Sequence, residues 1–182
     1  MSKPNLWAPW RMDYLNQLAG DRPPGTAAGG CFLCEAGEAG VDPQQRRDRL
    51  VLYRGEHATL LLNRYPYTNG HLLVAPHAHV AGLSDLALEA RAEVMEFCER
   101  GGRLLTEVVH PQGVNVGANL GRAAGAGVPG HLHFHLVPRW TGDTNFMDVV
   151  GAVRVIPQAL ETSYAMLRDG AARLFDEPEG VG

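Results

Sequence analysis

The sequence has few cysteines, no cluster of basic residues and no long apolar run, and each absence excludes a class of protein. Its three cysteines form an odd set, and in a chain without a secretory signal they do not suggest a disulfide framework. No stretch approaches the ~18 apolar residues of a transmembrane helix. The 16 Lys and Arg residues stand against 20 Asp and Glu, giving a formal charge of −4, and form no run typical of a nucleic-acid or anionic membrane surface. We therefore expect a soluble cytoplasmic protein that binds neither nucleic acid nor membrane.

The chain of 182 residues is long enough for one domain with a substantial core, and it contains no internal repeat. Residues 1–30 combine a segment with two Trp residues around Pro9 and a stretch rich in Gly, Pro and Ala. They are interpreted as an N-terminal arm and flexible linker, the arm packing on the domain or on a partner subunit. Residues 31–176 are expected to form the domain, and the acidic, glycine-rich residues 177–182 a frayed tail.

Three histidines alternate with large apolar residues in the segment 130–139. This period of two predicts a half-buried strand with the imidazoles of His131, His133 and His135 on one face. Neighbouring rings, roughly 6–7 Å apart on a strand, can serve one reaction centre or one metal, whereas the outer two are too distant to share a role. A neutral imidazole is also a competent nucleophile toward phosphorus or acyl carbon. The residues expected in the core from this segment are Leu132, Phe134 and Leu136.

The remaining pattern predicts an α+β fold, with an antiparallel sheet of about five strands and two main helices. The longer helix is predicted over 84–110, with Ser84 as its N-cap, a bend or break at Gly101-Gly102, and Cys98 buried. A second helix is predicted over 158–175. The predicted strands are 49–53, 58–62, 71–76, 113–120, the histidine segment and 149–156.

Cys31 and Cys34 are spaced as C-x-x-C, which suits two ligands of a tetrahedral zinc site or a redox pair. Redox pairs usually open the helix of a βαβ unit, and no such unit is evident in this sequence. Zinc is therefore the better interpretation, and it requires two further ligands from elsewhere in the chain.

A glycine-rich loop, residues 121–130, leads directly into the histidine segment. Glycines let backbone N–H groups approach a phosphate closely. The loop lacks the strand–loop–helix order of a P-loop, so by itself it indicates only a site suited to anions.

Two sequence blocks occur in a fixed order along the chain. The first is Asn63-Arg64-Tyr65-Pro66, continued by Gly70-His71-Leu72-Leu73-Val74, and the second is His131-Leu132-His133-Phe134-His135-Leu136-Val137-Pro138. Together they resemble the histidine triad (HIT) family of nucleotidyl hydrolases and transferases, over roughly residues 31–139. The segments 7–11 and 142–146 further resemble a bacterial, phosphorylase-like branch that acts on diadenosine tetraphosphate. The resemblance implies a HIT-like fold and a homodimer.

The resemblance also implies a nucleotide-binding enzyme that acts through a covalent intermediate. His133 would attack the α-phosphorus of a nucleotide and form a nucleotidyl-histidine, His135 would orient and polarise the site, and His71 would support the triad. Water as acceptor would make the enzyme a hydrolase, and orthophosphate would make it a phosphorylase. The implied nucleotide- and phosphate-binding groups are Asn63 at the ribose, Asn119 beside the phosphates, His135, and the backbone donors of Gly125, Ala126 and Gly127, which would act like an oxyanion hole.

Zinc-bearing members of the family suggest a ligand set for this chain as well. Their pattern maps onto Cys31, Cys34, His79 and His131, with His77 as the competing candidate for the third ligand. A closed Cys2His2 site of this kind would be structural, and it would leave His133 free.

One departure from the family pattern concerns Gly127, which stands where hydrolase branches usually have Gln. The change weakens any transfer of phosphoramidase activity and leaves room for a phosphate acceptor. Our main expectation is cleavage of dinucleoside polyphosphates such as diadenosine tetraphosphate, with phosphorolysis favoured over hydrolysis. One alternative is a hydrolase of nucleoside phosphoramidates or adenylylated lysine, and the other is a non-enzymatic, zinc-stabilised nucleotide-binding module.

Overall fold

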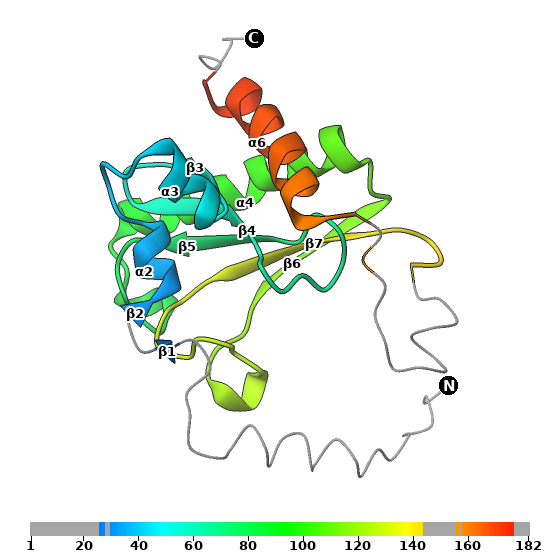
Figure 1. Cartoon of the computed structure of the whole chain (residues 1–182). Helices are drawn as coiled ribbons and strands as arrows, with labels where there is room; N and C mark the ends of the chain where they lie inside the picture. The colour runs from blue at the N-terminus through cyan, green and yellow to red at the C-terminus, as the bar shows by residue number, and fades with distance from the viewer. Residues whose placement is uncertain (1–25, 28–29, 144–155, 157, 177–182) are drawn as a thin grey trace, which may run out of the picture.

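A computed structural model describes residues 26–27, 30–143, 156 and 158–176. Its centre is an antiparallel five-stranded sheet in the order β3-β4-β5-β7-β6, preceded by a short separate pair, β1 and β2 (Figure 1). The predicted α+β fold, with about five antiparallel strands and two main helices, is confirmed. The strands are β1 Thr26–Ala27, β2 Gly30–Cys31, β3 Val51–Arg54, β4 Ala58–Leu62, β5 Leu72–Pro76, β6 Gly113–Ala118 and β7 Phe134–Arg139.

The two long helices, α4 (Leu88–Val109) and α6 (Leu160–Asp176), pack on one face of the sheet. The helix α4 lies against β4, β5 and β7, whereas α6 lies against β3 and α4. Buried residues recur at helical spacing along α4, so a single apolar stripe faces the sheet. Cys98 belongs to this stripe and is buried, as predicted. The buried residues of α4 are Ala90, Val94, Phe97, Cys98, Gly101, Leu104 and Leu105.

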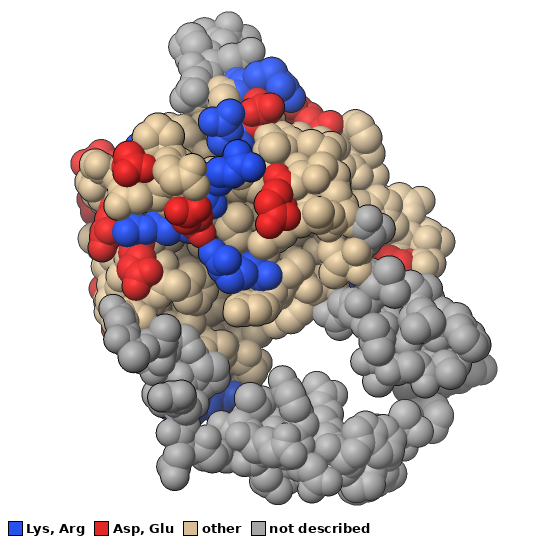
Figure 2. All heavy atoms as spheres, in the orientation of Figure 1, with Lys and Arg blue, Asp and Glu red and all other residues tan. Residues whose placement is uncertain are grey.

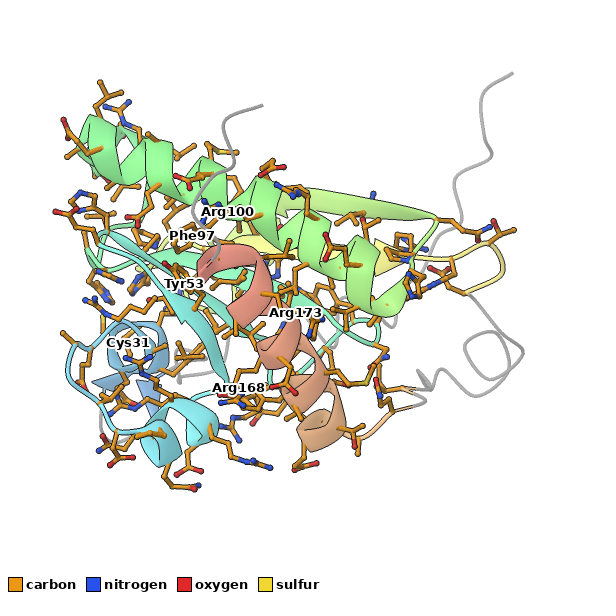
Figure 3. All side chains as sticks on the ribbon, turned by 90° about the horizontal axis from the view of Figure 1, so that it is seen from above. Cys31, Tyr53, Phe97, Arg100, Arg168 and Arg173 are labelled. Atoms are coloured by element: carbon orange, nitrogen blue, oxygen red, sulfur yellow. The ribbon has the colours of Figure 1, made fainter. Side chains whose placement is uncertain are left out.

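An aromatic cluster joins α6 to α4 and β3. Tyr53 lies 5.6 Å from Phe97 and 4.4 Å from Phe175, measured between ring centroids. The Arg100 guanidinium lies 5.1 Å from the centroid of the Phe175 ring, a cation–π geometry. Figure 3 shows Tyr53, Phe97 and Arg100 gathered beside the two long helices. This cluster fixes the last described helix to the domain.

Two short helices that the sequence pattern did not predict precede β3: α2 (Phe32–Ala36) packs on the opposite face of the sheet, and α3 (Pro43–Asp48) lies beside β3. In α2, Leu33 and Ala36 pack into a second apolar cluster with residues of β3, β4 and β5. The helix α3 begins with a capping box, in which the Asp42 side chain accepts from the Gln45 backbone and the Gln45 side chain from the Asp42 backbone. Asp followed by Pro and Gln is an N-terminal signal that could have revealed this helix.

The prediction for the start of the longer helix is wrong. Ser84 lies in a 3-10 turn, Leu83–Asp85, and its hydroxyl contacts the Asp85 carboxylate, while α4 begins at Leu88. Leu86 is buried in the core with an extended backbone, which separates the turn from the helix. At Gly101-Gly102, where a bend or break was predicted, no break occurs, because α4 is continuous. A Cβ atom on Gly101 would lie 2.7 Å from Leu136 Cδ2, so glycine permits close packing of the helix on β7.

The histidine strand begins later than the alternation predicts. It is β7, which starts at Phe134, so His131 and His133 precede it. Pairing with β5 runs from Leu72 opposite Leu136 to Val74 opposite Phe134. Beyond that point the Leu132 backbone N–H donates to Val80 O, and β5 ends at Pro76, which has no N–H for a ladder. Leu132, Phe134 and Leu136 are buried in the core as predicted.

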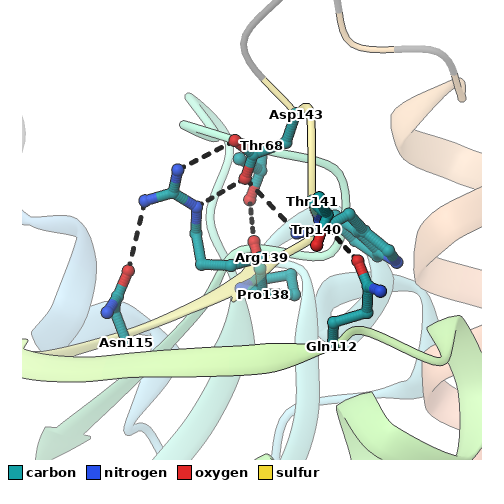
Figure 4. Close-up of polar contacts among 8 residues, drawn as sticks. All are labelled: Thr68, Gln112, Asn115, Pro138, Arg139, Trp140, Thr141 and Asp143. Carbon is teal, nitrogen blue, oxygen red and sulfur yellow. Dashed lines mark hydrogen bonds and ion pairs between the residues drawn. The ribbon is translucent and has the colours of Figure 1, made fainter.

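Polar contacts fasten the far end of β7, as Figure 4 shows. Arg139 makes a bidentate ion pair with Asp143, at 2.5 and 2.9 Å. It also donates to the Asn115 side chain of β6 at 3.3 Å. Thr68 Oγ1 donates to Pro138 O at 3.1 Å, which ties the segment between β4 and β5 to the same strand. The end of β7 is therefore held from both sides.

Arginines lie next to acidic side chains over the face that carries α3 and α6 (Figure 2). Within the described parts of the chain, no helix is both long and apolar enough to cross a membrane. The predicted N-terminal arm, the tail 177–182 and nearly all of the predicted strand 149–156 lie outside the described residues.

Two adjacent glycines of α4 give a matched test of the helix packing. We expect Gly101→Ala to lower the free energy of unfolding by about 1–3 kcal/mol, because the new methyl group overlaps Leu136. Gly102→Ala should raise it by about 0.5–1 kcal/mol, because a Cβ there meets no atom within 4 Å and alanine favours the helix. Urea unfolding of both variants measures the difference, and an equal gain at the two positions would contradict the close contact.

Candidate active site and metal centre

The pairing of β5 with β7 brings the two sequence blocks together. His135 of β7 is the partner of Leu73 in β5, and His71 lies one residue before that strand. His71 is fully buried, and its Nε2 lies 3.0 Å from Nδ1 of His135. The rings of His133 and His135 are 5.0 Å apart. The three histidines to which catalytic roles were assigned therefore form one contiguous group.

The orientation of His133 is set by a backbone carbonyl. Its Nδ1 lies 2.8 Å from His131 O, and because a carbonyl only accepts, Nδ1 carries the proton. In the neutral ring Nε2 then bears the lone pair. The side chain is 5% exposed, so little freedom remains for the ring to turn. This arrangement presents a defined basic nitrogen, as a nucleophilic histidine requires.

His135 has the opposite tautomer, set by a chain of hydrogen bonds. The Tyr67 backbone N–H donates to Nδ1 of His71 at 3.0 Å, so this nitrogen is an acceptor, and the Asn63 amide lies 3.2 Å from it. Nε2 of His71 must then carry the proton and donate to Nδ1 of His135. Nε2 of His135 is left as an N–H donor. It is buried and has no hydrogen-bond partner among the described residues.

Burial keeps both rings neutral. It lowers the pKa of His133 below the ordinary value for histidine, and the bond to the His131 carbonyl offsets this only in part. For His135, burial and the neighbouring His133 lower the pKa to about 4. At pH 7 the pair thus offers one lone pair and one N–H donor, which suits attack on a phosphorus atom and stabilisation of a negatively charged oxygen.

The glycine-rich loop contributes fewer free donors than the sequence suggested. The backbone N–H groups of Gly125 and Ala126 donate within the loop, to Arg122 O and Gly121 O. The Asn119 amide lies 3.5 Å from Gly125 O, at the limit of hydrogen bonding. Within the described chain no partner is found for the Gly127 N–H, and a Cβ at Gly127 would meet no atom within 4 Å. Of the three candidate backbone donors, Gly127 is the available one.

Four candidate metal ligands converge beside the group of His71, His133 and His135. The donor atoms of Cys31, Cys34, His79 and His131 all lie within 4.8 Å of one another. Cys34 Sγ is 3.1 Å from His79 Nδ1 and 3.4 Å from His131 Nδ1. Nε2 of His131 donates to Pro76 O at 2.8 Å, so its Nδ1 has a lone pair directed at the sulfurs. Two sulfurs and two nitrogens are a donor set that tetrahedral zinc accepts.

His77, the competing candidate, does not join this cluster. Its Nε2 lies 3.0 Å from Thr59 Oγ1 and its Nδ1 lies 3.3 Å from the Arg54 guanidinium. Arg54 also donates to Gly37 O, just after α2. His77 therefore packs beneath the helix that carries Cys34, and His79 completes the group.

Tyr67, which the sequence pattern did not identify, contacts the histidine group through both its backbone and its ring. Besides its backbone donation to His71, its ring lies 4.7 Å from that of His71 and 5.8 Å from that of His135, the latter nearly parallel at 24°. A backbone N–H leaves no trace in a sequence pattern, because every residue except proline has one. The aromatic ring next to the His71 block is the one signal that could have identified the position.

Comparisons with known proteins agree with this geometry. The HIT domain family model matches residues 44–142. An AP-4-A phosphorylase of Mycobacterium tuberculosis is 39% identical over 170 residues, covering 92% of this chain and 84% of that protein. A bis(5'-adenosyl)-triphosphatase of Saccharomyces cerevisiae is 31% identical over 91 residues, covering 50% of this chain and 44% of the yeast protein.

Among solved structures, a Zn-bound histidine triad family protein of Mycobacterium smegmatis is similar with a TM-score of 0.63. It is 30% identical in sequence, and the match covers 82% of this chain and 99% of that one. The family model spans more than half of the chain, and the mycobacterial phosphorylase matches nearly all of it. The chain therefore belongs to the HIT domain family of histidine triad proteins.

Proposed function

We propose that this protein cleaves dinucleoside polyphosphates, diadenosine tetraphosphate among them, and transfers the nucleotidyl group from His133 to orthophosphate. The observation that carries the proposal is the bond from Nδ1 of His133 to His131 O, because it fixes Nε2 as the basic nitrogen of a buried, neutral ring. The names of the M. tuberculosis and yeast relatives, a phosphorylase and a triphosphatase of adenosine dinucleotides, support this class of substrate.

The reaction proceeds in two displacements at one phosphorus atom. Nε2 of His133 attacks the α-phosphorus, a P–N bond forms, and the anhydride P–O bond breaks with its electron pair on departing ATP. The Nε2–H of His135 and the Gly127 N–H donate to the charged oxygens as they develop. Orthophosphate then attacks the same phosphorus, the P–N bond breaks, and ADP leaves with the histidine restored. Asn63 binds the ribose, and Asn119 lies beside the phosphates.

Orthophosphate as acceptor is supported at position 127. Glycine there is not required by packing, because a Cβ would meet no atom within 4 Å. The position therefore leaves space beside the loop that a longer side chain would occupy. The M. tuberculosis relative, 39% identical, carries the name of a phosphorylase.

Zinc bound by Cys31, Cys34, His79 and His131 completes the proposal. When bound, the ion supplies a structural cross-link between β2, α2 and the residues before β7. The His131 tautomer and the Zn-bound M. smegmatis relative support this choice of metal. Thiol ligands need a reducing compartment, which favours the cytoplasm.

We also propose that the protein forms a homodimer. Support comes from β6, the strand at the edge of the sheet, whose backbone is available for pairing along one side. Val116 in this strand and Leu120 just after it are 50% and 55% exposed, so a second copy would cover apolar surface.

Product analysis tests the reaction. With orthophosphate present, we expect the purified protein to convert diadenosine tetraphosphate to ADP and ATP, and His133→Ala to lower the rate by at least about 1,000-fold because the nucleophile is gone. Chromatography of the nucleotides gives the result. AMP and ATP formed without phosphate would indicate a hydrolase instead. Turnover of an adenosine phosphoramidate alone would favour the phosphoramidase alternative, and no turnover of either substrate would favour a binding module.

Substitutions by glutamine separate the roles of the two site histidines. The Gln amide can donate from nearly the position of Nε2, so His135→Gln should retain more activity than His135→Ala, for which we expect kcat to fall about 100-fold. At position 133 Gln should be as inactive as Ala, because an amide is no nucleophile. His57→Gln, which changes a histidine that packs against none of these rings, is the control. Equal losses for the two variants at position 135 would reject a donor role for that ring.

Metal analysis tests the cluster. We expect one zinc ion per chain, lost in Cys31→Ser/Cys34→Ser, together with a fall in Tm of about 10 °C or more, because a closed site contributes several kcal/mol to folding. His77→Gln, which changes a neighbouring residue outside the ligand set, should keep its zinc. Zinc retained by the double cysteine variant, or lost from His77→Gln, would contradict the assignment of ligands.

A further inference from the structure

The segment between β4 and β5, residues 63–70, is fastened at several points, and we call it the tyrosine loop. The Tyr65 N–H donates to Asn63 Oδ1 at 3.0 Å, and the Tyr67 N–H donates to His71. Further along, Thr68 donates to Pro138 O, and Asn69 is bonded to Gln158, just before α6, and to Ser163 in its first turn. The loop is therefore a preformed surface.

Its aromatic rings are nevertheless exposed. Tyr65 is 81% exposed, the largest value among the large hydrophobic side chains in the described ranges, and Tyr67 is 43% exposed. An ordered loop that presents aromatic surface to water commonly marks a binding site. The ring of Tyr67 packs on His135, which in turn packs on His133. Two successive ring contacts thus connect the exposed Tyr67 to His133, the proposed nucleophile.

We propose that Tyr65 and Tyr67 form a stacking subsite for the nucleobase on the half of the dinucleotide that departs. The inference rests on the proposed function, which assigns the attacked nucleoside to Asn63 and leaves the second base without a place. Stacking on an aromatic ring suits any nucleobase, because every base has a π-face. Arg64, the cationic residue of the loop, donates to Asp48 O and has no assigned role at the base. Because stacking holds the second base, the subsite accepts it with little selection between adenine and guanine.

Binding to a variant that cannot turn over tests this subsite. In a His133→Ala background, calorimetry compares diadenosine tetraphosphate with ADP, which lacks a second nucleoside. Because loss of an aromatic ring that stacks on a base weakens binding measurably, we expect Tyr65→Ala to weaken dinucleotide binding about tenfold and ADP binding less than twofold. Tyr65→Trp should restore dinucleotide binding. Leu88→Ala, which removes another highly exposed side chain, is the matched control and should change neither affinity.

Other outcomes would overturn the inference in distinguishable ways. Equal weakening of both ligands by Tyr65→Ala would show that the ring supports the first nucleoside. A smaller assembly in sedimentation for Tyr65→Ala, with unchanged affinities, would show that a second copy of the chain covers the loop. If no variant binds the dinucleotide, not even His133→Ala with Tyr65 intact, the proposed function fails and the subsite with it. Unchanged dinucleotide affinity alone removes the subsite and leaves the proposed function standing.

Discussion

The antiparallel pairing of β5 with β7 is the constraint on which the candidate site depends. It joins segments about sixty residues apart, sets Leu73 opposite His135, and brings His71 within hydrogen-bond distance of that ring. The same register buries Leu72, Val74, Phe134 and Leu136 against the two long helices. A slip of one residue would turn the apolar set toward the histidines' face and the histidines toward the core, so packing of the core also enforces the geometry of the site.

Backbone groups decide which nitrogen of each histidine is basic. A carbonyl at His131 fixes the proton of His133, and an N–H at Tyr67, acting through His71, fixes that of His135. Two chemically identical side chains, two residues apart in one segment, thus acquire opposite capacities. Since burial keeps both neutral, the difference comes from hydrogen bonding and requires no charge on either ring.

The sequence was sufficient to predict the sheet, the long helices, the burial of Leu132, Phe134 and Leu136, and the convergence of Cys31, Cys34 and His131. The sheet, the helices and the burial follow from periodicity, whereas the convergence was expected from the resemblance to zinc-bearing members of the family. That resemblance favoured His79, but the residues alone could not exclude His77, which is two residues away and differs only in what lies opposite it. The contacts that separate them come from Thr59 and Arg54, which are distant along the chain. Ser84 was misassigned because a good N-cap residue cannot reveal that burial of Leu86 will end the turn. The tautomers of the histidines could not be predicted either, because they are set by hydrogen bonds to backbone atoms, which every sequence shares.

His131 is attached to its surroundings in two independent ways. Its imidazole faces the two cysteines, whereas its main-chain oxygen accepts from His133. Any residue at this position would still offer that oxygen, while only a few could serve as a ligand. Evolution could therefore discard or exchange a metal held at this cluster by altering side chains, and the carbonyl that orients His133 would stay in place. Within such a lineage, loss of the metal-binding residues need carry no information about loss of catalysis.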